Sequence, residues 1–201
     1  MTTVDMKKYG KVAVLMGGSS GEREISLRSG AAVLKALLNN DVDAHGVDVD
    51  KHIFRVLQEN EFDRAFIALH GCGGEDGAMQ GGLDMLGLPY TGSDVMASSI
   101  CMNKVMTKKL WTVAGVQSPR FMSVDETVDY QQVVMALDVP FVIKPSLEGS
   151  SLGIHKVSNE LEFKAATQDA QKYQGALMAE QWVDGSEYTV AILDGVALPV
   201  I

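Results

Sequence analysis

Residues 139–154 read VPFVIKPSLEGSSLGI, an apolar segment that leads through Lys144 into a loop of small polar residues. β-Branched and aromatic residues before the lysine are typical of a buried strand, which would hold the lysine ammonium at a fixed point. The glycine and serine residues after it have backbone N–H groups that an anion can approach closely. The stretch therefore predicts a phosphate-binding strand and loop, although its residue order matches neither the P-loop nor the dinucleotide-binding fingerprint. The alternative is a hairpin with a small polar turn.

The chain before this stretch alternates between strand-like and helix-like segments. We predict strands at 11–16, 44–49 and 64–69 and helices at 22–38, 53–59 and 77–86. A short strand at 88–91 and a long helix over 94–113 follow them. Alternation of this kind predicts an α/β fold, in which a parallel, Rossmann-like sheet is covered by helices.

The segment after residue 120 has a different order, in which strands follow one another. Helices are predicted at 127–137 and 160–173. One strand is predicted to begin at residue 120, and further strands at 141–144, 154–157, 176–183, 187–193 and 196–201. A hairpin turn is predicted at Asp194-Gly195. This order predicts a small α+β domain of antiparallel strands. We therefore expect an α/β domain at 1–92, a central lid domain at 93–180, and the beginning of a third domain at 181–201. That third domain is expected to be truncated, because the last strand stops while still apolar.

The composition is that of an ordinary globular protein, with 46% hydrophobic and 21% charged residues among 201. A net charge of -9 argues against broad binding to nucleic acid or to a membrane surface, since either needs a basic face. The apolar run Val12–Met16 is too short for a signal peptide or a membrane span, so a cytoplasmic protein is expected. Cys72 and Cys101 have neither disulfide-framework nor metal-site spacing, and we expect reduced thiols.

A glycine-rich loop follows the first predicted strand and reads GGSSGERE at 17–24. Ligands of open parallel sheets bind beyond the carboxyl ends of the strands, which is where this loop lies. Ser19 and Glu22 can form a capping box at the start of the next helix. Glu22 is interpreted either as compensation of the helix dipole or as a carboxylate that holds the ammonium group of a small substrate.

A second loop of this kind follows the third strand and reads HGCGGEDG at 70–77. His70 is either a structural residue held by hydrogen bonds or a functional residue at the carboxyl end of a strand. Cys72 has no base at a recognisable spacing, so we do not expect it to act as a nucleophile.

Four segments carry a family resemblance, and in order they read GGSSGEREISLRSG, ALHGCGGEDGAMQGGLDMLGLPYTGSDVMASSICMNKVMTK, VIKPSLEGSSLGIHKV and MAEQWVDGSEYTVAIL. They resemble the D-alanine–D-alanine ligases, ATP-grasp enzymes of bacterial cell-wall (peptidoglycan) synthesis. The resemblance runs from about Lys11 to Ile201. The His-Gly-x-Gly-Gly-Glu-Asp-Gly loop and the Leu-Pro-Tyr-Thr-Gly-Ser run are specific to this family among ATP-grasp proteins. The central domain would then be the ATP-grasp lid, and residues 181–201 would begin the C-terminal ATP-grasp domain.

The resemblance implies a site for a first D-alanine. Glu22 would receive the ammonium of this substrate, and Ser150 would hydrogen-bond with Glu22. His70 would lie beside the substrate's carboxylate. These three are the candidate catalytic residues.

The resemblance also implies a site for the phosphates of ATP. Lys104 and Lys144 would neutralise the α- and β-phosphates. The loop with Glu148, Gly149 and Ser151 would close over them.

The other end of the nucleotide is implied to lie along residues 180–187. The expected contacts are the adenine amino group with Glu180, the adenine ring with the backbones of Gln181 and Val183 and the side chain of Trp182, and the ribose hydroxyls with Glu187. The alternatives for these residues are solvated strand positions and a core tryptophan. Strand alternation over 178–187 would put the carboxylates on one face, which agrees with either interpretation.

In the implied reaction, ATP phosphorylates the carboxylate of the first D-alanine, and the amine of a second then displaces phosphate. The family's ligands for two Mg²⁺ ions and its transition-state arginine would lie beyond Ile201, so the chain alone is expected to be inactive. A homodimer is also implied. Two alternatives stay open, a nucleotide-binding module without chemistry of its own and another ATP-grasp carboxylate–amine ligase. The choice between D-alanine and D-lactate as second substrate depends on residues beyond Ile201.

Three positions depart from the family's usual pattern. Asn103 stands where aspartate is common, Gln181 where lysine is usual, and Cys72 where arginine is common. The side chain at position 181 is expected to be tolerated, because adenine would meet the backbone there.

Overall fold

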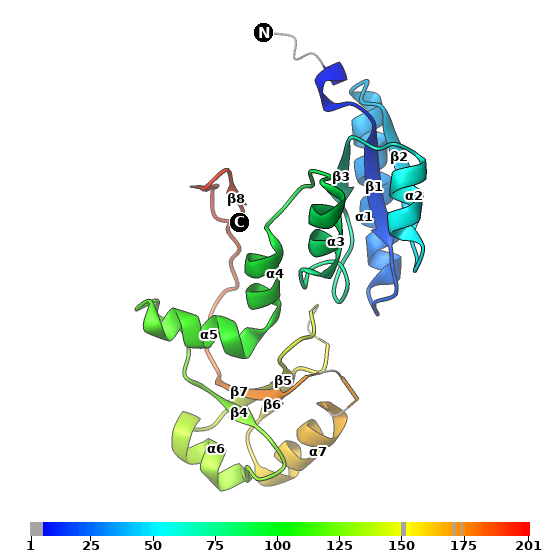
Figure 1. Ribbon diagram of the computed structural model, residues 1–201. Helices are drawn as coiled ribbons and strands as arrows, with labels where there is room; N and C mark the ends of the chain where they lie inside the picture. The colour runs from blue at the N-terminus through cyan, green and yellow to red at the C-terminus, as the bar shows by residue number, and fades with distance from the viewer. Residues whose placement is uncertain (1–5, 150–151, 171, 174) are drawn as a thin grey trace.

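The computed structural model of the protein describes residues 6–149, 152–170, 172–173 and 175–201. Figure 1 shows two lobes, an upper one with strands β1–β3 and helices α1–α3, and a lower one with strands β4–β7 and helices α6 and α7. Helices α4 and α5 lie between them. The chain therefore combines a parallel and an antiparallel sheet in one α/β fold, as the sequence predicted.

The upper lobe is a three-stranded parallel sheet in the order β2-β1-β3, preceded by a 3-10 helix at Met6–Tyr9. Its elements are β1 Val12–Gly17, α1 Arg23–Asn39, β2 Ala44–Val49, α2 Ile53–Glu59, β3 Arg64–Ile67 and α3 Ala78–Leu86. Every residue of β1 is buried. Helix α1 packs on one face of the sheet, and α2 and α3 pack on the other. Burial on both faces explains why β1 is a continuous apolar run.

The lower lobe is a four-stranded antiparallel sheet in the order β4-β7-β5-β6. Its elements are β4 Phe121–Val124, α6 Tyr130–Leu137, β5 Phe141–Pro145, β6 His155–Val157, α7 Glu160–Ala170 and β7 Leu177–Gln181. Both helices pack on the same face, where Val133 and Phe163 meet Phe141, Ile143 and Ala179. The opposite face carries the residues that alternate with these in β5 and β7, and it looks toward α5.

The predicted long helix over 94–113 is two helices, which corrects the sequence expectation. Helix α4 spans Val95–Met102 and α5 spans Lys104–Val113. Asn103 between them has extended backbone, and its side chain accepts a hydrogen bond from the Met106 amide at 3.1 Å. Asparagine is a favoured N-cap residue, so it starts a new helix instead of continuing the old one.

Several predicted bounds are also corrected at the ends of elements. The expected strand at 88–91 makes only an isolated bridge between Tyr90 and Ala65. Helix α6 begins at Tyr130, because Asp129 and Gln132 form its capping box. The expected capping box of Ser19 is wrong, since Glu22 is the N-cap of α1 and makes no capping hydrogen bond with its side chain.

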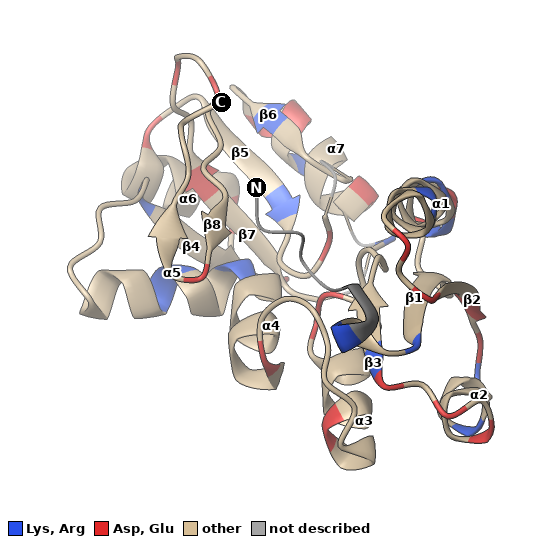
Figure 2. Cartoon of the chain, turned by 90° about the horizontal axis from the view of Figure 1, so that it is seen from above, with Lys and Arg blue, Asp and Glu red and all other residues tan. Residues whose placement is uncertain are grey.

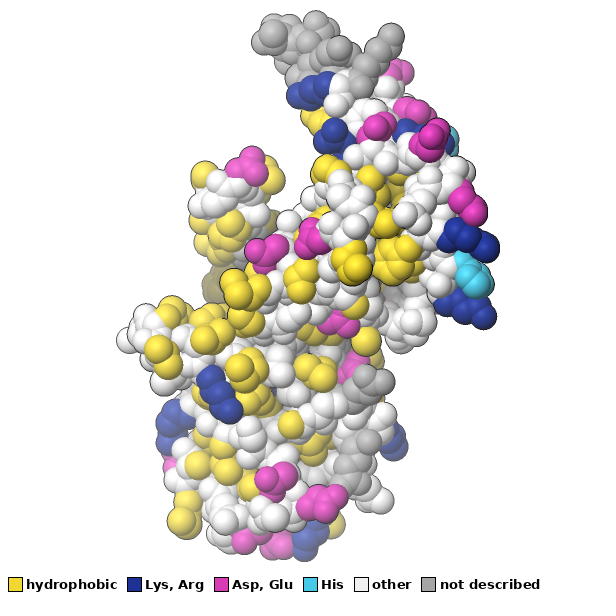
Figure 3. Space-filling view, in the orientation of Figure 1, with side chains coloured by type: hydrophobic (Ala, Val, Ile, Leu, Met, Phe, Trp, Pro, Cys, Tyr) yellow, Lys and Arg dark blue, Asp and Glu magenta, His cyan; other side chains and the backbone are white. Residues whose placement is uncertain are grey.

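The last twenty residues form less sheet than the sequence predicted. Beyond Gln181, strands are described only at β8 Ile192–Leu193 and β9 Val196–Ala197. The turn between them is confirmed, with positive φ at Asp194 and Gly195. Residues 183–201 are all exposed, and Figure 3 shows the hydrophobic side chains of this segment to the left of the upper lobe. A strand needs a neighbour to pair with, and the described chain offers these residues only each other.

Among the described residues, none of the helices combines the length and hydrophobicity that a membrane span requires. The division of the chain at residues 92 and 180 stays a prediction.

Candidate functional site

A pocket of about 230 Å³ lies where α5 meets the loop after β5. It brings together Lys104, Lys144, Glu148 and Gly149, four of the predicted ATP-binding residues, with apolar side chains of Pro145, Leu152 and Ile154 around them. The Lys104 ammonium donates to the Glu148 carbonyl, and the Lys104 amide donates to the Ser146 carbonyl at 3.0 Å. The start of α5 is thus tied to the loop that the sequence predicted to close over phosphate. Ser150 and Ser151 of that loop lie outside the described residues.

Lys144 and Glu180 come from neighbouring strands and meet on the face opposite α6 and α7. Val142 pairs with Glu180 and Lys144 pairs with Met178 in the ladder of β5 and β7, so the two charged side chains are diagonal neighbours on one face. They form a direct ion pair. The sequence assigned these residues to opposite ends of one nucleotide, whereas the structure brings them together. Their roles toward ATP stay predictions.

Lys108 is a further charged residue beside Lys144 and Glu180, and sequence reasoning missed it. It pairs with the second oxygen of Glu180 and is buried. Its signal in the sequence is its spacing, because Lys104 and Lys108 are four residues apart in a helix and therefore lie on one face. Figure 2 shows basic segments on α5 and at the end of β5.

The charged residues at and beside the pocket are Lys104, Lys108, Lys144, Glu148 and Glu180, and they carry more positive than negative charge. Burial, followed by the positive charge of Lys144, lowers the pKa of the Lys104 ammonium. Lys108 and Lys144 pair with the Glu180 carboxylate, and Lys104 lies near the carboxylates of Glu148 and Glu180. Three lysines against two carboxylates leave an excess of positive charge, so the pocket beside Lys104 and Lys144 attracts an anion.

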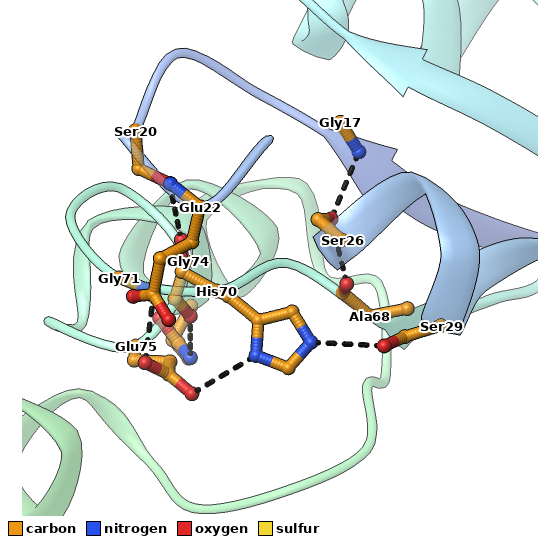
Figure 4. A network of polar contacts seen from close by, with 11 residues as sticks. Gly17, Ser20, Glu22, Ser26, Ser29, Ala68, His70, Gly71, Gly74 and Glu75 are labelled. Carbon is orange, nitrogen blue, oxygen red and sulfur yellow. Dashed lines mark hydrogen bonds and ion pairs between the residues drawn. The ribbon is translucent and has the colours of Figure 1, made fainter. Parts of the chain in front are cut away.

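Glu22 lies next to two loops that are distant in sequence, and its side chain is largely buried. A Cβ added at Gly71 would be 2.8 Å from Glu22 Oε2, and one at Gly149 would be 3.2 Å away. Ser20 reinforces the arrangement, because its hydroxyl donates to the His70 carbonyl at 2.7 Å. Figure 4 shows the loops of Glu22 and His70 side by side. The distance from Gly149 places the start of the third predicted loop next to Glu22 as well.

His70 is held on both sides of its ring. Its Nε2 lies 3.2 Å from Ser29 Oγ of α1, and its Nδ1 lies 3.7 Å from Glu75 Oε1 (Figure 4). The other oxygen of Glu75 accepts a hydrogen bond from the Gly71 amide at 2.8 Å. These contacts orient the ring beside Glu22, and a third of the side chain stays exposed for contact with a ligand.

Cys72, in the same loop, is not an activated thiol. Its hydrogen bond with Asp76 and its burial raise the pKa of the thiol. A thiolate is the nucleophilic form, so a raised pKa suppresses reactivity near neutral pH.

The residues predicted to bind adenine and ribose are dispersed along and after the end of β7. Gln181 ends the strand, and its amide donates to the Arg120 carbonyl at 2.9 Å. Trp182 is half-buried under Lys156, whose ammonium is 4.0 Å from the ring centroid, so the core-tryptophan alternative is wrong. Val183 and Glu187 are exposed. The predicted alternation fails after Gln181, because β7 ends there.

The described residues contain no group of three or more His, Cys, Asp or Glu side chains that could hold a metal ion.

Comparisons with known proteins place this chain among related sequences. Residues 50–93 match the family model of the D-ala D-ala ligase N-terminus, and residues 110–200 match that of the D-ala D-ala ligase C-terminus. A D-alanine–D-alanine ligase of Pseudomonas putida is 48% identical over 200 residues, covering 100% of this chain and 63% of the relative. A D-alanine–D-alanine ligase B of Chromobacterium violaceum is 51% identical over 196 residues, covering 98% of the chain and 65% of the relative.

Solved structures give the same result. The D-alanine–D-alanine ligase of Bacillus anthracis has a TM-score of 0.86 at 31% identity, covering 94% of this chain and 63% of that one. A structure of the same enzyme complexed with ATP has a TM-score of 0.84 at 29% identity, covering 94% and 64%. The chain thus spans less than two thirds of the length of these relatives. Its motifs, its fold and its matches together show that this chain belongs to the D-alanine–D-alanine ligase family.

Proposed function

We propose that this protein acts as an ATP-dependent ligase that joins two D-alanines into D-alanyl-D-alanine for peptidoglycan precursor synthesis. The observation that carries the proposal is the pocket in which Lys104, Lys144, Glu148 and Gly149 meet beside Glu22. A related ligase has been solved with ATP, which supports a nucleotide as the ligand.

The proposed chemistry begins with a poor electrophile, the carboxylate of the first D-alanine. One of its oxygens attacks the γ-phosphorus of ATP, the bond to the β-phosphate oxygen breaks, and ADP leaves. The amine of the second D-alanine then attacks the acyl carbon, the bond to phosphate breaks, and the amine gives up a proton. In this scheme Lys104 and Lys144 neutralise phosphate charge, so the contribution of the chain is orientation and electrostatic stabilisation.

Substrate binding in this proposal rests on the three loops at Glu22. The Glu22 carboxylate would hold the substrate ammonium, and His70 would lie beside the substrate carboxylate. The loop at 149–151 would exclude water from the acyl phosphate, with Ser150 hydrogen-bonded to Glu22 and Ser151 over the phosphates.

The remaining nucleotide contacts are proposed for the segment after β7. Glu180, Gln181, Trp182, Val183 and Glu187 would meet adenine and ribose as the family resemblance implies. The ordered Trp182 ring supports an aromatic wall for the base, while Val183 and Glu187 are exposed and accessible to a ligand.

We further propose that the 201-residue chain does not complete this reaction by itself. The relatives have about a third of their length without a counterpart here, and the family resemblance implies that the Mg²⁺ ligands lie beyond Ile201. Action in the cytoplasm as a homodimer is part of the same proposal. The second candidate, a nucleotide-binding module without chemistry of its own, is favoured by a lysine pocket that has no metal-binding group near it among the described residues.

Calorimetric titration of the chain with ATP tests the nucleotide site. Lys144→Ala is expected to weaken ATP binding about 10- to 100-fold, because a charged hydrogen bond is worth roughly 1.5–3 kcal/mol. Lys109→Ala is the matched control, since Lys109 is an exposed lysine on α5. Equal affinities of the two variants would remove the phosphate role from Lys144.

A fusion protein distinguishes the ligase proposal from the binding-module proposal. The chain is joined to the part of the Pseudomonas putida relative that has no counterpart in it, and D-alanyl-D-alanine is measured after incubation with ATP, Mg²⁺ and D-alanine. Dipeptide formation supports the ligase. A folded fusion that binds ATP and forms no dipeptide supports the module.

A further inference from the structure

Lys108 is a buried lysine in the second turn of α5, and its ammonium has several polar partners. It donates to Ser118 Oγ at 3.0 Å and to the Pro119 carbonyl at 3.1 Å, and it pairs with Glu180 Oε1. A lysine ammonium has three donor hydrogens, so these contacts use all of them. The Phe121 ring, with its centroid 5.5 Å from the ammonium, covers another side. Lys108 is therefore fixed in position.

Burial decreases along the row of charges from Lys108 to the pocket. The exposed fractions of the side chains are 7% for Lys108, 13% for Glu180 and 18% for Lys144. Lys144 and Lys104 line the pocket, whereas Lys108 is not among the lining residues in the part of the chain that the structure describes. Glu180 binds Lys108 through one oxygen and Lys144 through the other. Glu180 thus links the fixed lysine to the pocket.

We propose that Lys108 is a positioning residue of the nucleotide site, which holds Glu180 so that Lys144 presents its ammonium to the phosphates. The inference rests on the proposed function, because it assigns the pocket to a nucleotide. Lys108 also shares the negative charge of Glu180. Without it, Glu180 would pair with Lys144 alone and compete more strongly with an incoming phosphate for that ammonium.

A purely structural role of Lys108 has different consequences. Replacing a buried charge changes the free energy of unfolding, but that change does not depend on which ligand is offered. A positioning role lowers the affinity for phosphate-bearing ligands, including pyrophosphate, which has no base for Glu180 to contact. It also disappears when Lys144 is absent, because Lys108 then has nothing to position.

The test compares Lys108→Met with Lys109→Met in the 201-residue chain, with circular dichroism and urea denaturation as checks of folding. Calorimetry measures the affinities for ATP, ADP and pyrophosphate. Lys108→Met is expected to bind all three about tenfold more weakly, equivalent to about 1.4 kcal/mol. Lys109→Met is expected to match the wild type. Lys108→Arg keeps the charge and is expected to recover part of the loss.

A double-mutant cycle with Lys144→Met supplies the decisive comparison. Lys108→Met is expected to cause no further loss of pyrophosphate affinity in that background. A folded Lys108→Met that binds pyrophosphate as Lys109→Met does, or that loses equal pyrophosphate affinity with and without Lys144, overturns the proposal. If Lys108→Met fails to fold, Ser118→Ala, which removes one of the hydrogen bonds of Lys108, takes its place with the same expected pattern at smaller size.

A measurement without nucleotide keeps this inference separate from the proposed function. The ¹³Cε NMR signal of Lys144, assigned by its loss in Lys144→Met, is expected to shift in Lys108→Met and to stay in place in Lys109→Met. If the wild type binds no ATP, the proposed function fails, whereas the NMR shift still reports the coupling between the two lysines. An unchanged Lys144 signal contradicts that coupling.

Discussion

Glu180 is the residue that joins the lower sheet to α5, because its two oxygens pair with lysines from both elements. Each lysine is mostly buried, so their charges are poorly screened by water. Losing the carboxylate would leave the neighbouring ammonium groups of Lys108 and Lys144 without the negative charge that neutralises them. At the scale of single residues, this carboxylate therefore controls both stability and the local excess of positive charge.

Glu180→Gln is expected to lower the free energy of unfolding by about 3 kcal/mol, since removing one partner leaves buried charge uncompensated. Glutamine keeps the shape of the side chain and removes only its charge. Urea denaturation measures the change, and Glu187→Gln, at an exposed position of the same segment, serves as the control. A loss no larger than that of the control would contradict the role of Glu180.

The lowered pKa of Lys104 predicts how nucleotide binding depends on pH. Burial and the charge of Lys144 lower its pKa, so it loses its proton at a pH where ordinary lysines are still charged. The affinity for ATP is therefore expected to fall as pH rises through this lowered pKa, over the range from neutral pH to the ordinary pKa of lysine. Calorimetry of Lys104→Met should show a weaker affinity without this decline. A wild-type affinity that is constant over the range contradicts the assignment.

At the scale of elements, the upper lobe depends on the close approach of α1 to β1. Gly30 of α1 faces Met16 of β1, and an added Cβ would lie 2.5 Å from the Met16 Cβ. Ser26, one turn earlier, accepts from the Gly17 amide at 2.9 Å and donates to the Ala68 carbonyl at 2.7 Å. Helix and strands are thus held at a distance that keeps the loops of Glu22 and His70 together.

Gly30→Ala is expected to destabilise the protein by about 1–3 kcal/mol, because the methyl group meets an atom next to the backbone that cannot swing away. Gly21→Ala is the matched control, since an added Cβ there has no described atom within 4 Å. Thermal denaturation followed by circular dichroism measures both. Equal melting temperatures would mean that α1 moves away from β1 without cost.

At the scale of the whole molecule, the candidate site lies where the two lobes meet. The upper lobe contributes the loops of Glu22 and His70, and the lower lobe contributes β5 and the loop that follows it. Helix α5 is tied to that loop of the lower lobe through the contacts of Lys104 with Ser146 and Glu148. A ligand at this place should therefore stabilise elements of the lower lobe together with α5.

Hydrogen exchange with and without ATP tests this arrangement. ATP is expected to slow exchange of backbone amides in α5, β5 and β7, because the bound ligand opposes opening of the elements that contact it. Amides of β2, on the far edge of the upper sheet, are expected to be unchanged. Protection confined to the upper lobe would place the nucleotide elsewhere.

The order of elements and several site residues could be read from the sequence because they depend on local patterns. The apolar run of β1, the strand before Lys144 and the glycine-rich loops have periods and residue types that determine strands and turns directly. Glu22, His70 and Lys144 were recognisable because each follows or ends such a strand. Asn103 could have signalled the helix break, since its side chain is a known helix cap.

Only the tertiary structure decided which distant side chains meet. The pairing of Lys108 and Lys144 with Glu180, and the contact of Glu22 with two loops, depend on strand register and on the packing of α5 between the lobes. Residues 183–201 show the reverse, since a sequence suited to long strands forms there a hairpin with two short strands that pair with each other. Periodicity is a property of neighbours along the chain, whereas ion pairs and sheet edges require partners whose positions are set by the whole fold.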